Sequence, residues 1–95
     1  MNTQIKLHED EIKTIKKTIS KIFGKCEIYI FGSRLERVGG DVDIFIIPQN
    51  RENLFDKMIK AKVLLKDELL RNIDIVIHKD FKREIEKEAL KGAKI

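Results

Sequence analysis

A chain of 95 residues can enclose one hydrophobic core but not two lobes, so a single domain over residues 1–95 is expected. The composition is 42% hydrophobic and 38% charged, which excludes a disordered chain. No apolar run approaches the ~20 residues that cross a bilayer, so no membrane partner is expected. The net charge of +4 is spread among nearly as many acids without interleaved aromatic residues, so nucleic-acid binding ranks below a solvated charged surface.

The first half of the chain predicts a helix followed by two strands. Residues 8–23 carry four isoleucines and a phenylalanine at the three- and four-residue spacing of an amphipathic helix, and Gly24 is a natural C-terminal stop. The apolar run 26–31 predicts a strand. One helical turn is expected over 33–37, and a second strand over 41–47.

The second half predicts a long helix, a strand and a last helix. The long helix is expected over 51–70, and the strand over 73–78, which is rich in isoleucine and valine. The last helix is expected over about 80–91, with Asp80 as its N-cap. The order of elements predicts an α/β (α+β) fold, a small sheet covered by helices. The residues expected on the apolar face of the long helix are Leu54, Phe55, Met58, Ile59, Leu65 and Leu69.

The N-terminal segment and the cysteine content indicate the compartment. Residues 1–6 lack the apolar core of a signal peptide. The one cysteine, Cys26, cannot form an intrachain disulfide, and its place at the start of an apolar strand indicates a small buried side chain rather than a reactive thiol. We therefore expect a cytoplasmic protein.

The stretch over residues 31–47 combines a Gly-Ser turn with two aspartates one residue apart. Asp41 and Asp43 stand at the start of a strand, so their side chains point to the same face. Two neighbouring carboxylates repel each other, and a divalent cation such as Mg²⁺ removes that repulsion. Backbone N–H groups of the turn at Gly32 and Ser33 suit a phosphate. The stretch therefore predicts a site for a metal ion and a phosphate.

A third aspartate, Asp74, lies within the apolar strand 73–78, where aspartate is rare. It could face solvent or pair with an arginine or lysine. If this strand lies beside strand 41–47, three carboxylates instead converge on one patch. Such a patch suits nucleotidyl transfer with two Mg²⁺ ions roughly 3.5–4 Å apart. In that scheme Asp41 and Asp43 ligate the metals that hold a triphosphate, and Asp74 ligates the metal at the attacking hydroxyl.

This combination resembles the signature of the DNA polymerase β-like nucleotidyltransferase superfamily, especially its minimal nucleotidyltransferase (MNT) branch. The resemblance covers about residues 26–78. It rests on Phe-Gly-Ser-Arg at 31–34, Gly-Gly-Asp-Val-Asp-Ile at 39–44 and Ile-Asp-Ile-Val-Ile at 73–77, in that order. The spacer between the Gly-Ser turn and the aspartates is shorter than in many members, which indicates a tighter turn.

The resemblance implies a mixed sheet with a polymerase β-like core, Mg²⁺ as cofactor and an NTP donor, ATP first. Members of this branch often pair as antitoxins with a small helical HEPN-type protein encoded nearby, and some transfer AMP to a tyrosine of that toxin. A protein adenylyltransferase acting as the antitoxin of a HEPN/MNT pair is thus implied. The implied catalytic residues and metal ligands are Asp41, Asp43 and Asp74, and the implied nucleotide-binding residues are Gly32, Ser33 and Arg34.

Two other functions stay open from the sequence. One is a non-catalytic antitoxin that neutralises its partner by contact and keeps the carboxylates as a nucleotide or metal site. The other is a protein that binds nucleic acid through its lysines. The three aspartates favour the enzyme over both. His8 and His78 match no motif and are expected to be bystanders. The small chain leaves the substrate cleft incomplete, which suggests a homo- or hetero-oligomer.

Overall fold

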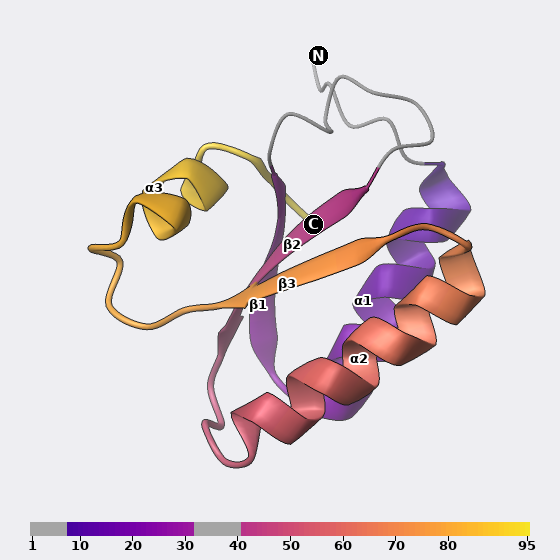
Figure 1. The fold of residues 1–95 in the computed structure, drawn as a ribbon, viewed down its shortest axis with the longest axis horizontal. Coiled ribbons are helices and arrows are strands. Elements are labelled where there is room, and N and C mark those ends of the chain that lie inside the picture. Colours follow the sequence, from indigo (N-terminus) through magenta and orange to yellow (C-terminus); the bar gives the residue numbers. More distant parts are fainter. Residues whose placement is uncertain (1–7, 32–40) are drawn as a thin grey trace.

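The structure is a computed structural model that describes residues 8–31 and 41–95. The described strands form one mixed sheet in the order β3-β2-β1-β4 (Figure 1). β1 pairs antiparallel with β2 and β4, whereas β2 and β3 are parallel. The expected mixed sheet covered by helices is confirmed. The elements are α1 (Glu9–Phe23), β1 (Cys26–Phe31), β2 (Val42–Pro48), α2 (Leu54–Leu69), β3 (Ile73–Ile77), α3 (Glu84–Leu90) and β4 (Ala93–Lys94).

Helices cover both faces of the sheet, with α1 and α2 packed together on one face and α3 on the other (Figure 1). The main core lies between the sheet and the α1–α2 pair. Alternation along β2 separates the faces: Ile44 and Ile46 belong to the main core, while Phe45 packs with Ala89 of α3. The side chains of this main core that have no exposed surface are Ile15, Ile19, Ile44, Ile46, Ala61 and Leu65.

Helix α2 is the crossover that makes β2 and β3 parallel. A parallel connection needs a segment that returns the chain to the start of the next strand, and a helix packed on the sheet does this. Ala61 and Leu65 anchor α2 and have no exposed surface. The helix ends with Leu70 in the left-handed conformation, after which β3 begins at Ile73. No helix in the described part of the chain is long and apolar enough to cross a membrane.

Two predictions about α2 were wrong. The helix begins at Leu54 rather than at residue 51, after Asn53 in a left-handed conformation. Phe55 and Ile59 were expected in the core but are 69% and 44% exposed. A helix turns by about 100° per residue, and seating Leu65 against the sheet rotates those two side chains away from it.

The C-terminal region also differs from the prediction. Helix α3 begins at Glu84 with Arg83 as its N-cap, so Asp80 is not the cap. The Asp80 carboxylate instead accepts the N–H of Lys82 at 2.8 Å, in a tight turn before the helix. The two-residue strand β4 was not predicted. Gly92 permits it, because a Cβ there would lie 2.2 Å from the carbonyl oxygen of Ile30.

Three further predictions concern Gly24, Cys26 and the helical turn over residues 33–37. The helix stop at Gly24 is confirmed, with a φ of 78° that favours glycine. Cys26 is half-buried in β1, and burial raises the pKa of its thiol, as suits a structural cysteine. The helical turn expected over 33–37 lies outside the described residues.

Candidate functional site

Two of the three candidate aspartates lie directly side by side on neighbouring strands. The parallel register pairs Asp43 of β2 with Asp74 of β3. Because side chains alternate along a strand, Asp43 shares the face of Phe45, and Asp74 shares the face of Val76. Both belong to the side of the sheet that α3 covers. The condition set from the sequence, that strand 73–78 lies beside strand 41–47, is therefore met.

Asp41 lies at the same end of the sheet, immediately before β2. The side-chain amide of Asn72 donates to Asp41 Oδ1 at 3.1 Å, and the N–H of Val42 donates to the Asn72 carbonyl at 2.9 Å. These two hydrogen bonds join the start of β2 to the start of β3. Asn72 was not singled out from the sequence, since nothing local marks a residue that bonds to a position 31 residues away.

The Asp74 side chain is open to solvent. β3 is an edge strand, and the Asp74 carboxylate is 60% exposed, with Oδ1 3.9 Å from Nζ of Lys62 on α2. Solvent exposure and pairing with a lysine, both considered from the sequence, therefore describe it. This position leaves the carboxylate accessible to a second molecule. Such an exposed ion pair adds at most about 1 kcal/mol, so Lys62 is readily displaced.

The aspartates share one end of the sheet without forming a closed cluster. Among residues 8–31 and 41–95, no three His, Cys, Asp or Glu side chains lie close enough together to hold a metal ion. The donor set nevertheless suits a hard cation, because Asp43 and Asp74 offer carboxylate oxygens from directly paired positions. The predicted nucleotide-binding residues Gly32, Ser33 and Arg34 lie outside the described residues.

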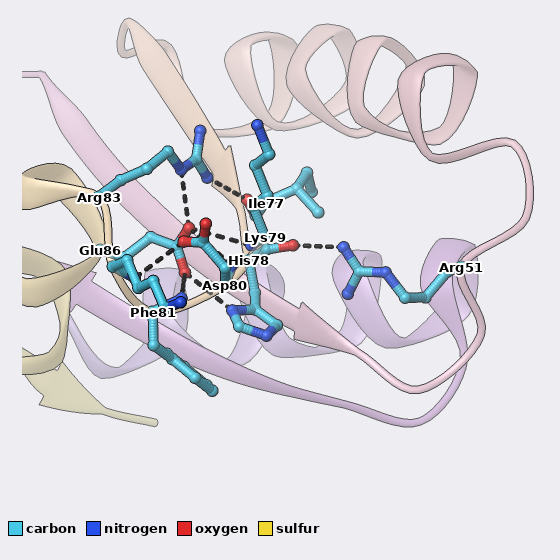
Figure 2. A network of polar contacts seen from close by, with 9 residues as sticks. Arg51, Ile77, His78, Lys79, Asp80, Phe81, Arg83 and Glu86 are labelled. Carbon is cyan, nitrogen blue, oxygen red and sulfur yellow. Dashed lines mark hydrogen bonds and ion pairs between the residues drawn. The ribbon is translucent and has the colours of Figure 1, made fainter.

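A second polar centre, not predicted from the sequence, surrounds the buried Glu86 at the start of α3 (Figure 2). Its side chain has no exposed surface. The groups within hydrogen-bond distance of this carboxylate are His78 Nδ1 (2.8 Å), the N–H groups of Lys79 (3.0 Å), Asp80 (3.3 Å) and Phe81 (2.9 Å), and Arg83 Nε (2.7 Å). The turn between β3 and α3 is thus wrapped around one carboxylate. Arg83 also donates to the Ile77 carbonyl at 2.7 Å, and Arg51 donates to the His78 carbonyl.

The hydrogen bonds decide the ionisation of Glu86. Burial on its own would raise the pKa of this carboxyl. The side chains of His78 and Arg83, together with backbone N–H groups of the turn, outweigh burial and lower the pKa from 4.5 to about 2. His78 also stacks on Phe81, with ring centroids 3.8 Å apart. His78, expected to be a bystander, therefore has a structural role in this turn.

The fold is similar to those of toxin-antitoxin proteins. The structure of tri-AMPylated Shewanella oneidensis HEPN toxin in complex with MNT antitoxin matches with a TM-score of 0.71 and 18% identity, over 90% of this chain and 68% of that chain. A structure of the toxin-antitoxin MntA-HepT matches with a TM-score of 0.58 and 21% identity, over 74% of this chain and 55% of that chain. This chain thus spans only about half the length of the second structure's chain.

A comparison with sequence families identifies the family. The family model described as "Polymerase beta, Nucleotidyltransferase" matches residues 9–95, from the start of α1 to beyond β4. No curated protein matches the sequence. Because the family model matches nearly the whole chain, the chain belongs to the polymerase beta nucleotidyltransferase family.

Proposed function

We propose that this protein is a Mg²⁺-dependent nucleotidyltransferase that transfers AMP from ATP to a hydroxyl group of a partner protein, with release of pyrophosphate. Membership of the nucleotidyltransferase family supports the reaction class. The observation that carries the proposal is the pairing of Asp43 with Asp74 across neighbouring parallel strands, on one face of the sheet. Paired carboxylates at the open end of a sheet suit a divalent cation and the phosphates bound to it.

Each aspartate has a distinct proposed role. Asp41 and Asp43 would hold Mg²⁺ that carries the triphosphate, with Asp41 oriented by its hydrogen bond from Asn72. Asp74 would ligate the metal ion at the acceptor hydroxyl, and its 60% exposure leaves room for a protein acceptor to approach. Bound Mg²⁺ supplies the positive charge that stabilises the reacting phosphate and favours loss of the hydroxyl proton. Gly32, Ser33 and Arg34 remain the proposed contacts of the phosphates.

The proposed partner is a helical HEPN-type toxin encoded next to this protein. This protein would act as the antitoxin of that toxin in the cytoplasm. The similar solved structures support this partner, because one is a tri-AMPylated HEPN toxin in complex with MNT antitoxin. Another is the toxin-antitoxin MntA-HepT. A tri-AMPylated toxin in such a complex also supports AMP as the transferred group.

The test is an AMP-transfer assay with the product of the adjacent reading frame, ATP and Mg²⁺, followed by intact mass spectrometry of that product. The wild-type chain should add AMP, and Asp43→Asn or Asp74→Asn should lower the rate at least about 100-fold, since a lost metal contact removes several kcal/mol of transition-state stabilisation. Asp10→Asn, on an exposed position of α1, is the matched control and should retain the wild-type rate.

Two outcomes would contradict the proposed mechanism. If both site variants transfer AMP at the wild-type rate, the paired aspartates are not the site. If the wild-type chain binds and neutralises the adjacent product without any mass increment, and both variants do the same, the protein is instead an antitoxin that acts by contact.

A further inference from the structure

Helix α2 exposes a row of large apolar side chains on the side that faces away from the core. Phe55 is 69% exposed, Ile59 44% and Val63 61%. They are spaced four residues apart and therefore form one stripe along the helix. Isolated exposed apolar residues are ordinary, but a contiguous stripe on a small domain marks an interaction surface.

The stripe leads into a pocket at the N-terminal end of α2. The pocket has a volume of about 300 Å³, and Phe55 and Met58 form part of its apolar wall. Arg51, Lys79 and Arg83 also line the pocket. Arg83 is paired with the buried Glu86 carboxylate, with Nε 2.7 Å from Oε2, so the positive charge of the pocket comes from Arg51 and Lys79. Arg51 is held in place by its hydrogen bond to the His78 carbonyl. Such a pocket suits an apolar side chain with a carboxylate beside it.

Charged residues flank the stripe asymmetrically. At about 100° per residue, Lys62 and Lys66 lie on the side toward β3. The contact between Lys62 and Asp74 of β3 agrees with this placement. Asp56 and Lys60 lie on the opposite flank, whose charges are mixed, and Asp67 continues the four-residue spacing of the stripe itself. All of these side chains are exposed. The flank near β3 is therefore positive, like the pocket.

This asymmetry disfavours an antiparallel pair of two copies of the chain as the occupant. Two α2 helices packed antiparallel about a two-fold axis would place each flank opposite the same flank of the other copy. The positive flank of Lys62 and Lys66 would then face the positive flank of the other copy, and like charges in such positions oppose association. The stripe and its positive flank therefore suit a partner that carries carboxylates beside its apolar side chains.

We propose that the α2 docking surface, formed by Phe55, Ile59, Val63 and the adjoining pocket, binds an amphipathic helix of the partner protein. That helix places an apolar anchor in the pocket and carboxylates along the flank of Lys62 and Lys66. The inference rests on the proposed function for the partner's identity. The 3.9 Å contact between Lys62 and Asp74 makes the surface continuous with the candidate site, so docking brings the partner to the edge where Asp74 is exposed.

The test measures binding of the adjacent-frame product by calorimetry, using Phe55→Ser and Val63→Ser. Loss of an aromatic anchor should weaken binding about 10- to 100-fold. Both side chains are largely exposed, so the thermal midpoint of the free chain should stay unchanged. The matched control is Ile85→Ser on α3, which is 42% exposed and should bind like the wild type. Lys66→Glu should slow association, most strongly at low salt.

AMP transfer separates docking from chemistry. Phe55→Ser should need a higher partner concentration to reach half of the maximal rate, while its rate at saturation stays that of the wild type. Normal binding and transfer by Phe55→Ser and Val63→Ser would overturn the docking surface and leave the proposed function intact. A wild-type chain that neither binds nor modifies the adjacent product would overturn both. A dimer of the free chain that Phe55→Ser dissociates, seen by sedimentation, would assign the surface to a second copy.

Discussion

Removing the charge of Glu86 should destabilise the protein strongly, because Glu86 is the one charged residue that is fully buried among the residues the structure describes. Glu86→Gln keeps the shape of the side chain but replaces one acceptor oxygen with a donor NH₂ group. Oε2 accepts from Lys79, Asp80 and Arg83, and Oε1 from Phe81. Either orientation of the amide therefore points its NH₂ group at a backbone N–H of the turn.

The structure sets the size of the loss. A buried donor left without an acceptor costs about 1–3 kcal/mol. The Arg83 side chain is 41% exposed, so water solvates its charge when the pair is lost, and the full cost of breaking a buried charge pair does not apply. Because more than one N–H group of the turn loses its acceptor, we expect a total of about 2–4 kcal/mol. A domain of this kind is stable by about 5–15 kcal/mol, so the variant would lose a large part of its stability.

The same carboxylate makes stability depend on acid. Its pKa is lower in the folded chain, about 2, than the 4.5 of the free side chain. A group with a lowered folded pKa contributes stability that is fully present above its unfolded pKa and is lost as the pH falls toward the folded value. The wild type should therefore lose this contribution from about pH 5 down to about pH 2, and Glu86→Gln should show a flatter decline over that range.

Urea unfolding followed by circular dichroism, repeated between pH 7 and pH 2, measures both effects. Glu84→Gln is the control, because Glu84 lies on the same helix but its side chain is 92% exposed. Its ion pair with Lys87 Nζ, at 3.7 Å, lies on the surface and contributes little. Its change should stay within about 0.5 kcal/mol. A Glu86→Gln variant within about 1 kcal/mol of the wild type, with an unchanged pH profile, would refute this account of the turn.

Two further predictions concern the packing of α2 and β4. Leu65→Ala should lower the free energy of unfolding by about 2–5 kcal/mol, as expected for a fully buried leucine. Leu64→Ala, at a position that is 41% exposed, should cost less than half as much. Equal losses in urea titrations would mean that α2 is rotated differently. Gly92→Ala would place a Cβ 2.2 Å from the Ile30 carbonyl oxygen, so β4 must shift and the free energy of unfolding should fall by about 1–3 kcal/mol. Amide exchange should become faster at Ile95, whose N–H donates to the Ile28 carbonyl. Unchanged exchange would contradict the close approach.

Local patterns in the sequence were sufficient for most of the sheet. The runs 26–31 and 73–77 are almost continuous isoleucine and other β-favouring residues, and both are strands. The i, i+2 spacing of Asp41 and Asp43 was enough to place them on one face. The pairing of Asp43 with Asp74 required the order of the strands as well, which the sequence supplied only as a condition.

Long-range contacts explain what the sequence could not predict. Helix α2 has two apolar rows, and periodicity alone does not say which of them faces the sheet; only the sheet itself selects Leu65 over Phe55. Glu86 stands among other charged residues, and nothing local distinguishes it from Glu84 or Glu88. Its burial arises from the turn at 79–81, whose backbone donors surround it. β4 forms because β1 leaves an open edge, not because Ala-Lys favours a strand.

The isoleucine packing between the sheet and α2 has a consequence for mutational screens. Ile44 and Ile75 are register partners one position beyond Asp43 and Asp74, and they point to the opposite face. A shift of two residues between β2 and β3 would preserve the faces of the sheet but separate the aspartates. The fit of the isoleucines against the helices opposes such a shift. A screen for lost activity should therefore recover substitutions at Ile44 and Ile75, which point away from the aspartates and act on the site through the packing and register of its two strands.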